Sequence, residues 1–178
     1  MPRNTPIRLV IDANIARSAG PEHATFPTSK NCRDFLMAVE RHGFSIVSTP
    51  ELREEWNRHQ SNFFRTWRTR MMGRKRIETL PSAVNLILRG KIENGAANEG
   101  ERDAMLKDCH LLEVALQSDK RIASCETRVP KHFARVSSSI VEIRSILWVN
   151  PDDETETIFL WLENGAPAEK GRQLRNYS

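Results

Sequence analysis

Hydrophobic positions along the chain fall into short continuous runs and longer stripes with helical spacing. Ile7 to Ile11 and Phe44 to Ser48 are short runs rich in β-branched and aromatic residues, which predicts two buried strands. Gly43 lies just before the second run and is suited to end a helix in a left-handed conformation. The helix expected between the two strands carries an apolar stripe with i, i+3, i+4, i+7 spacing, made of Cys32, Phe35, Leu36 and Val39.

A long helix is predicted directly after the second strand. Thr49 is a preferred N-cap residue, and Pro50 suits the first helical position. The apolar stripe that follows is made of Leu52, Trp56, His59, Phe63, Trp67 and Met71. The spacing therefore predicts one helix that continues through Met71.

Strand and helix signals continue to alternate in the second half of the chain. We expect a short apolar helix opened by Pro81, a loop over 93–100, a helix over 101–116 and a strand over 122–125. The segment over 139–147 fits a helix or a strand. A last helix is expected to begin around 150–153 and to stop near Gly165. This alternation predicts an α/β protein with a three-layer α/β/α fold and a mainly parallel central sheet. Residues 1–150 are expected to form the main domain, and residues 151–178 a C-terminal helix and basic tail.

Composition narrows the functional classes. The 178 residues carry a net charge of +4, which permits a polyanionic partner without requiring one. Three widely spaced cysteines indicate neither a disulfide framework nor a thiolate zinc site, and they are typical of a reducing compartment. No apolar run approaches the length of a membrane span, and the start of the chain lacks the apolar core of a signal peptide. We therefore expect a cytoplasmic protein that does not associate with membranes.

Four acidic residues occupy positions where such a fold would bring them together. Asp12 and Glu126 each follow a predicted strand directly, and parallel sheets bind ligands at the carboxyl ends of their strands. Asp108 completes the apolar stripe of its helix, four residues after Ala104 and three before Leu111. A carboxylate on a buried helix face is normally paired or bound to a metal. Glu55 lies on the inward stripe of the helix after Thr49.

Each of these acids also has an ordinary structural explanation. Asp12 would cap the next helix, Asp108 would be a satisfied core carboxyl group, Glu55 would be an exposed helix charge and Glu126 a loop acid. Glu51 and Glu54 lie in the same helical turns as Glu55 and remain alternatives to it. The order of all four acids along the chain, more than any one of them, suggests a common site.

That order resembles the PIN-domain nucleases over residues 7–150. The resemblance is carried by LVIDANI at Asp12, STPELREEW at Glu55, KDCHLLEVAL at Asp108 and IASCETR at Glu126. It implies an endonuclease that cuts single-stranded RNA with these four catalytic acids, although the residues themselves do not separate RNA from DNA. The last acid is usually Asp in the family and is Glu in this chain. Asn14 and Ser124 fall at positions that are often polar and close to the substrate in such proteins.

Carboxylates that converge on one site repel one another, and a divalent cation relieves that repulsion. Hard oxygen ligands without Cys or clustered His favour Mg²⁺ or Mn²⁺ over Zn²⁺. The expected metal ligands are Asp12, Asp108 and Glu126. The implied reaction is metal-dependent hydrolysis of a phosphodiester bond.

A basic segment runs from Arg65 to Arg76 without an acid. Arg68, Arg70 and Arg74 are expected to contact substrate phosphates, because arginine forms bidentate contacts with phosphate. The alternative is a solvated basic face of an amphipathic helix. Trp67 continues the inward stripe, so we expect it in the core and not as a platform for stacked bases.

Other functions fit less well. A phosphatase of the haloacid dehalogenase type would carry an acid at the position of Asn14, and a dinucleotide-binding fold would carry a glycine-rich turn after the first strand. The remaining alternative is a PIN-like module that binds nucleic acid or protein with weak or no catalysis. Because many PIN nucleases are toxins restrained by an antitoxin, the resemblance adds an antitoxin-type protein to the partners considered, along with RNA and a second copy of the chain.

Overall fold

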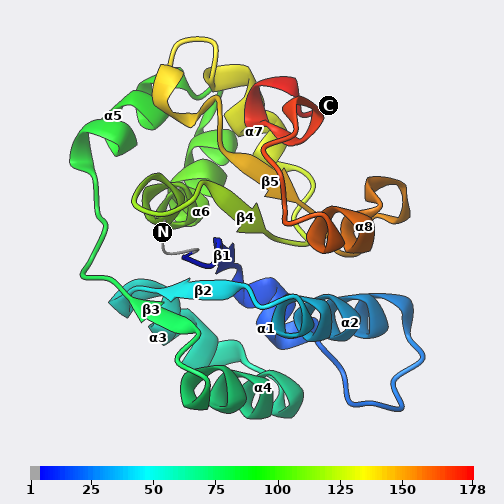
Figure 1. Cartoon of the computed structure of the whole chain (residues 1–178). Helices are drawn as coiled ribbons and strands as arrows, with labels where there is room; N and C mark the ends of the chain where they lie inside the picture. Colours follow the sequence, from blue (N-terminus) through cyan, green and yellow to red (C-terminus); the bar gives the residue numbers. More distant parts are fainter. Residues whose placement is uncertain (1–4) are drawn as a thin grey trace.

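The computed structural model describes residues 5–178, so residues 1–4 of the domain expected over 1–150 lie outside the described part. Its centre is a five-stranded sheet in which every pairing is parallel and the strand order is β3-β2-β1-β4-β5 (Figure 1). The strands are β1 (Arg8–Ile11), β2 (Ser45–Ser48), β3 (Ile77–Thr79), β4 (Arg121–Ala123) and β5 (Leu147–Val149).

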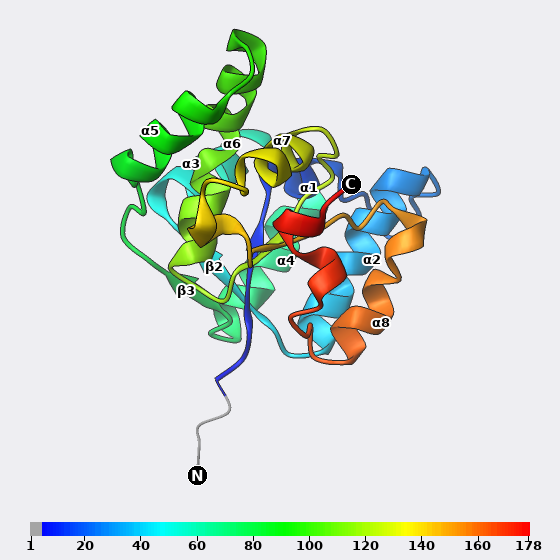
Figure 2. The same cartoon turned by 90° about the horizontal axis from the view of Figure 1, so that it is seen from above.

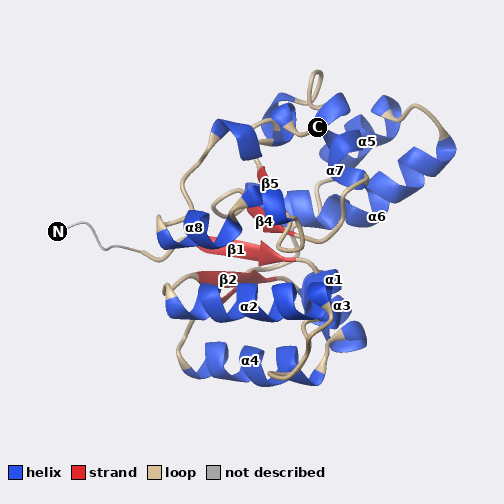
Figure 3. Cartoon of the chain, turned by 90° about the vertical axis from the view of Figure 1, so that its right-hand side faces the viewer, coloured by secondary structure: helices blue, strands red, loops and turns tan. Residues whose placement is uncertain are grey.

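Helices cover both faces of the sheet, with α2 and α4 on one side and α6 and α7 on the other (Figures 1 and 3). Right-handed crossovers explain this: the chain moves from β1 toward β3 along one half of the sheet and from β4 to β5 along the other. The three-layer α/β/α fold with a parallel sheet is confirmed. The helices are α1 (Ala13–Ser18), α2 (Pro27–Arg41), α3 (Pro50–His59), α4 (Asn62–Gly73), α5 (Leu86–Gly95), α6 (Glu99–Leu116), α7 (Val129–Val136) and α8 (Ile158–Glu163).

The elements predicted from strong local signals are confirmed. Gly43 follows α2 with φ +78°, the left-handed conformation that glycine adopts without strain. The Thr49 side chain accepts a hydrogen bond from the backbone N–H of Leu52 and caps α3, with Pro50 in its first turn. Helix α6 ends where expected, at Leu116, and begins two residues earlier than expected, at Glu99, with Asn98 as its N-cap.

The prediction of one long helix after β2 is wrong. The chain leaves helical geometry at Gln60, which is extended, and Ser61 caps a second helix by accepting a hydrogen bond from the N–H of Phe64. This interruption resets the helical phase, so Phe64 is buried in place of Phe63, and His59 is exposed. The local cap at Ser61 overrides an apolar stripe that crosses the break.

Several weaker expectations also need correction. Pro81 does not open a helix: α5 begins after Asn85, whose side chain caps it, and extends into the loop expected over 93–100. The segment 139–147 forms neither a regular helix nor a long strand, but a short 3₁₀ turn that leads into β5. The last helix starts later than expected, at Ile158. Strand β3 and helix α7 were not predicted: β3 is only three residues long, whereas α7 carries apolar residues with helical spacing, Val129, Phe133 and Val136, which could have indicated it.

Aromatic residues fill much of the core between sheet and helices. Trp67 is fully buried and its indole N–H donates to the carbonyl of Leu36, 3.0 Å away, which confirms that it is a core residue. The free thiols of Cys32 and Cys125 are in contact, with their Sγ atoms 3.4 Å apart. No helix among the described residues has the length and apolar character needed to cross a membrane.

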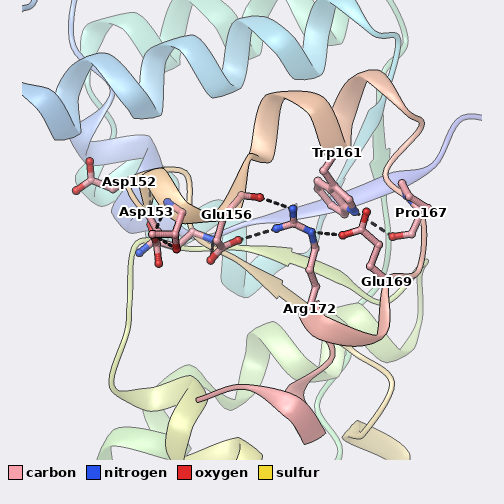
Figure 4. Close-up of polar contacts among 9 residues, drawn as sticks. Asp152, Asp153, Glu156, Trp161, Pro167, Glu169 and Arg172 are labelled. Carbon is pink, nitrogen blue, oxygen red and sulfur yellow. Dashed lines mark hydrogen bonds and ion pairs between the residues drawn. The ribbon is translucent and has the colours of Figure 1, made fainter.

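The C-terminal segment packs onto the sheet. Helix α8 lies beside α2, and the last turns cover the region near β5 and α7 (Figures 1 and 2). Arg172 is held by Glu156 and Glu169, with N–O distances of 3.0 and 2.7 Å (Figure 4). The charge of Arg172 is therefore largely neutralised within the chain, so this residue offers little positive charge to a polyanion.

Candidate active site

The site lies at the carboxyl edge of the sheet between β1 and β4, where the connections on the two sides run toward opposite edges of the sheet. In the order β3-β2-β1-β4-β5, the crossovers diverge between β1 and β4, and open α/β sheets bind ligands at such a switch point. Asp12 is the residue after β1, and Ser124 is the residue after β4. Both side chains are therefore held at the carboxyl edge of adjacent, hydrogen-bonded strands.

A pocket of about 210 Å³ opens at this edge. The acids predicted from the sequence all line it, although they come from four separate segments of the chain. The residues that line the pocket are Asp12, Ala13, Asn14, Arg17, Glu55, His59, Lys107, Asp108 and Glu126. We call it the carboxylate pocket.

Asp12 is fixed by two kinds of hydrogen bond. Its Oδ1 accepts from the backbone N–H of Asn14 at 3.3 Å, so it caps α1 as the ordinary explanation expects. Its Oδ2 accepts from Ser124 Oγ at 2.6 Å. The same hydroxyl oxygen accepts from Asn14 Nδ2 and from the backbone N–H of Glu126, both at 3.0 Å. Ser124 is fully buried, so it orients its neighbours and does not face the pocket, whereas Asn14 lines it.

Burial and mutual repulsion disfavour the ionised forms of two of these acids. Burial raises the pKa of Asp12, against the hydrogen bonds from Ser124 and Asn14 that favour its charged form. Burial, followed by the negative charges of Asp12 and Glu126, raises the pKa of Asp108 to about 6. The surroundings of both side chains therefore disfavour a negative charge.

Glu55 is the α3 acid that belongs to the pocket. Its Oε2 lies 3.2 Å from His110 Nε2, and this neighbour lowers the pKa of Glu55. Burial alone would lower the pKa of His110, but Glu55, together with the Lys107 carbonyl and Asp12, raises it overall. The other two α3 acids face elsewhere, since Glu54 is exposed and pairs with Arg58, and Glu51 accepts from the hydroxyl of Ser82.

Cations at the rim of the carboxylate pocket were missed by the sequence reasoning. Arg17 and Lys107 are exposed and line it, and among residues 5–178 neither forms an ion pair. The positive charge of Lys107 lowers the pKa of both Glu55 and Asp108. The sequence could have indicated both cations, because Arg17 follows Asn14 by three residues on α1 and Lys107 directly precedes Asp108.

The chemistry of the donors fits a hard divalent cation. Carboxylate oxygens are the preferred ligands of Mg²⁺ and Mn²⁺, and a cation would offset the charge that raises the pKa of Asp108. Across residues 5–178, no three His, Cys, Asp or Glu side chains converge closely enough to hold an ion as they are positioned. Coordination by Asp12, Asp108 and Glu126 would therefore need side-chain rotations within the pocket.

The three arginines expected to contact phosphates lie outside the carboxylate pocket, Arg68 and Arg70 on α4 and Arg74 at its C-cap. Arg70 and Arg74 both pair with Glu40 of α2, at 3.0 and 3.3 Å. Arg68 donates to Asn57 and lies over the ring of Trp56. Of these three arginines, Arg70 and Arg74 are thus neutralised by Glu40, and Arg68 has no acidic partner among residues 5–178.

Comparisons of this chain with protein-family models, with curated proteins and with solved structures find no match.

Proposed function

We propose that the chain is a metal-dependent endonuclease that hydrolyses single-stranded RNA in the carboxylate pocket, as its resemblance to the PIN-domain nucleases implies. One observation carries the proposal: acids that the sequence places in four separate segments all line one pocket at the switch point of the sheet. An unrelated set of cap, core and surface acids has no reason to share a pocket.

Several residues in and beside the pocket would have a part in the proposed reaction. Asp12, Asp108 and Glu126 would hold Mg²⁺ or Mn²⁺, which when bound activates water and stabilises negative charge on the phosphate. Ser124 keeps the Asp12 carboxylate in a single orientation through its 2.6 Å hydrogen bond. Arg17 and Lys107 offer unpaired positive charge where a phosphate would enter.

The alternative is a PIN-like module with weak or no catalysis. Two observations favour it: Glu55 is engaged by His110, and no three side chains of residues 5–178 are positioned to hold an ion. Such a module would bind RNA or a protein partner through the same surface but would leave phosphodiester bonds intact.

Cleavage of an end-labelled single-stranded RNA by the purified protein separates the two functions. With Mn²⁺ or Mg²⁺ we expect product bands, and with EDTA in place of the metal we expect none. A single-stranded DNA of the same sequence tests the substrate class. Intact RNA at saturating Mn²⁺, with a correctly folded protein, would favour the binding module.

A further inference from the structure

A second pocket, of about 370 Å³, lies between α3, α4 and the edge of the sheet at β3. Figure 1 shows these elements gathered at one end of the sheet. Its charged lining residues are Arg53, Arg68 and Lys75, and the other residues that line it are Ser48, Trp56, Met72, Ile77 and Thr79. None of these residues is acidic. We call it the basic pocket.

The three cations of the basic pocket lack acidic partners. Within residues 5–178, Arg53, Arg68 and Lys75 form no ion pair. In contrast, Arg70 of α4 and Arg74, the C-cap residue of that helix, share Glu40. The nearby acid on β3 does not face the pocket: Glu78 alternates with Ile77 and Thr79 along the strand and pairs with Arg8. The positive charge of this pocket is therefore available to an external anion.

Arg68 is half-buried and is the least exposed of the three cations. Its Nη2 donates to Asn57 at 2.9 Å, but its Nη1 atom is buried without any hydrogen-bond partner. Burial, together with the positive charges of Arg53 and Arg65, lowers the pKa of Arg68. A buried donor without a partner carries a free-energy cost, and an anion that accepts from it would remove that cost.

Trp56 connects the basic pocket to the carboxylate pocket. Its ring lies under the guanidinium of Arg68, and its indole N–H donates to the carbonyl of Ile11, the residue before Asp12, at 2.9 Å. Glu55, the preceding residue of α3, lines the carboxylate pocket. The two pockets thus lie on either side of one helix.

We propose that the basic pocket binds a phosphodiester group of the substrate strand, in addition to the group held at the carboxylate pocket. This rests on the proposed function, because it takes the ligand to be a polynucleotide. Three cations without acidic partners, and a buried guanidinium nitrogen without an acceptor, match a phosphate oxygen in charge and in hydrogen bonding. The pocket replaces Arg70 and Arg74 as the phosphate contact on this face.

The test is equilibrium binding of a short fluorescent single-stranded RNA in EDTA, which prevents metal-dependent cleavage. The double variant R53Q/K75Q removes two exposed cations of the basic pocket, and R68Q is measured separately in case its burial affects folding. The matched control R41Q/K131Q removes one exposed arginine and one exposed lysine from other surfaces, and within residues 5–178 neither forms an ion pair. We expect R53Q/K75Q to weaken binding about tenfold and to reduce the salt slope by about 1.4, or about 0.7 for each lost phosphate contact. The control is expected to stay close to wild type.

Equal changes in R53Q/K75Q and the control, or no change in either, would overturn the proposal. A wild-type protein that binds no RNA in EDTA would also overturn it, while cleavage with Mn²⁺ would still decide the proposed function separately. RNA binding through the basic pocket without cleavage would keep this inference and reject the nuclease. Thermal stabilisation by inorganic phosphate of wild type but not of R53Q/K75Q, with equal RNA binding, would assign the pocket to a free anion instead.

Discussion

Replacing Asp108 with asparagine is expected to abolish metal-dependent RNA cleavage while making the metal-free protein more stable. Asn keeps the size of the side chain but removes a ligand charge and one of the negative charges that repel each other in the carboxylate pocket. The pKa of Asp108 is raised from 3.8 to about 6, so its ionised form destabilises the folded protein by about 3 kcal/mol at neutral pH. Because the side chain is partly exposed, solvent screening reduces this to about 2 kcal/mol, or about 4–8 °C in Tm.

The stabilisation should depend on pH in a defined direction. A carboxyl group whose pKa is higher in the folded state favours folding while it is protonated, and that contribution is lost as the pH rises from about 4 through about 6. The difference in Tm between D108N and wild type should therefore be near zero at pH 4 and largest above pH 6. The control is D103N, which removes an exposed carboxylate from the same helix. A D108N protein that cleaves RNA like wild type would show that Asp108 is only a core residue.

Replacing Ser124 with alanine is expected to lower the cleavage rate by about 10- to 100-fold, because groups that orient metal ligands typically contribute this much. Asp12 Oδ2 would lose its 2.6 Å hydrogen bond from the Ser124 hydroxyl while remaining buried. Since that bond favours the ionised form of Asp12, its loss raises the pKa of Asp12 further. The acidic limb of the pH–rate profile should then move to higher pH.

Two further variants show whether this effect comes from the hydroxyl group. S124T keeps a hydroxyl at the same position and should recover most of the activity. S139A removes an exposed hydroxyl outside the carboxylate pocket and should behave like wild type. That hydroxyl donates only to the carbonyl of Val136. A normal rate and an unmoved pH profile for S124A would remove Ser124 from the site.

Much of the framework around the carboxylate pocket could be predicted because its signals are local. Strand β1 is a continuous apolar run that ends at Asp12, and Thr49 caps α3 through a hydrogen bond to a residue three positions away. The position of Asp108 in the pocket follows from the stripe of one well-formed helix, α6. In each case the deciding interactions lie within one or two turns of the chain.

Features that depend on distant residues could not be predicted in the same way. Glu40 neutralises Arg70 and Arg74 across 30 and 34 residues, so the basic segment of α4 gave no indication of which arginines remain unpaired. The pairing of Glu55 with His110 likewise joins α3 to α6. Strand β3 is three residues long and lies at the edge of the sheet, where half-exposed positions carry little pattern.

The position at which Mn²⁺ binds tests the metal-dependent catalytic site most directly. Anomalous scattering from a crystal soaked in saturating Mn²⁺ should show a peak in the carboxylate pocket, contacted by carboxylate oxygens of Asp12, Asp108 and Glu126. A crystal of D108N treated in the same way should lose that peak. Absence of the peak from the wild-type pocket, or a peak held by other residues, would contradict the claim that these acids form a metal-dependent catalytic site.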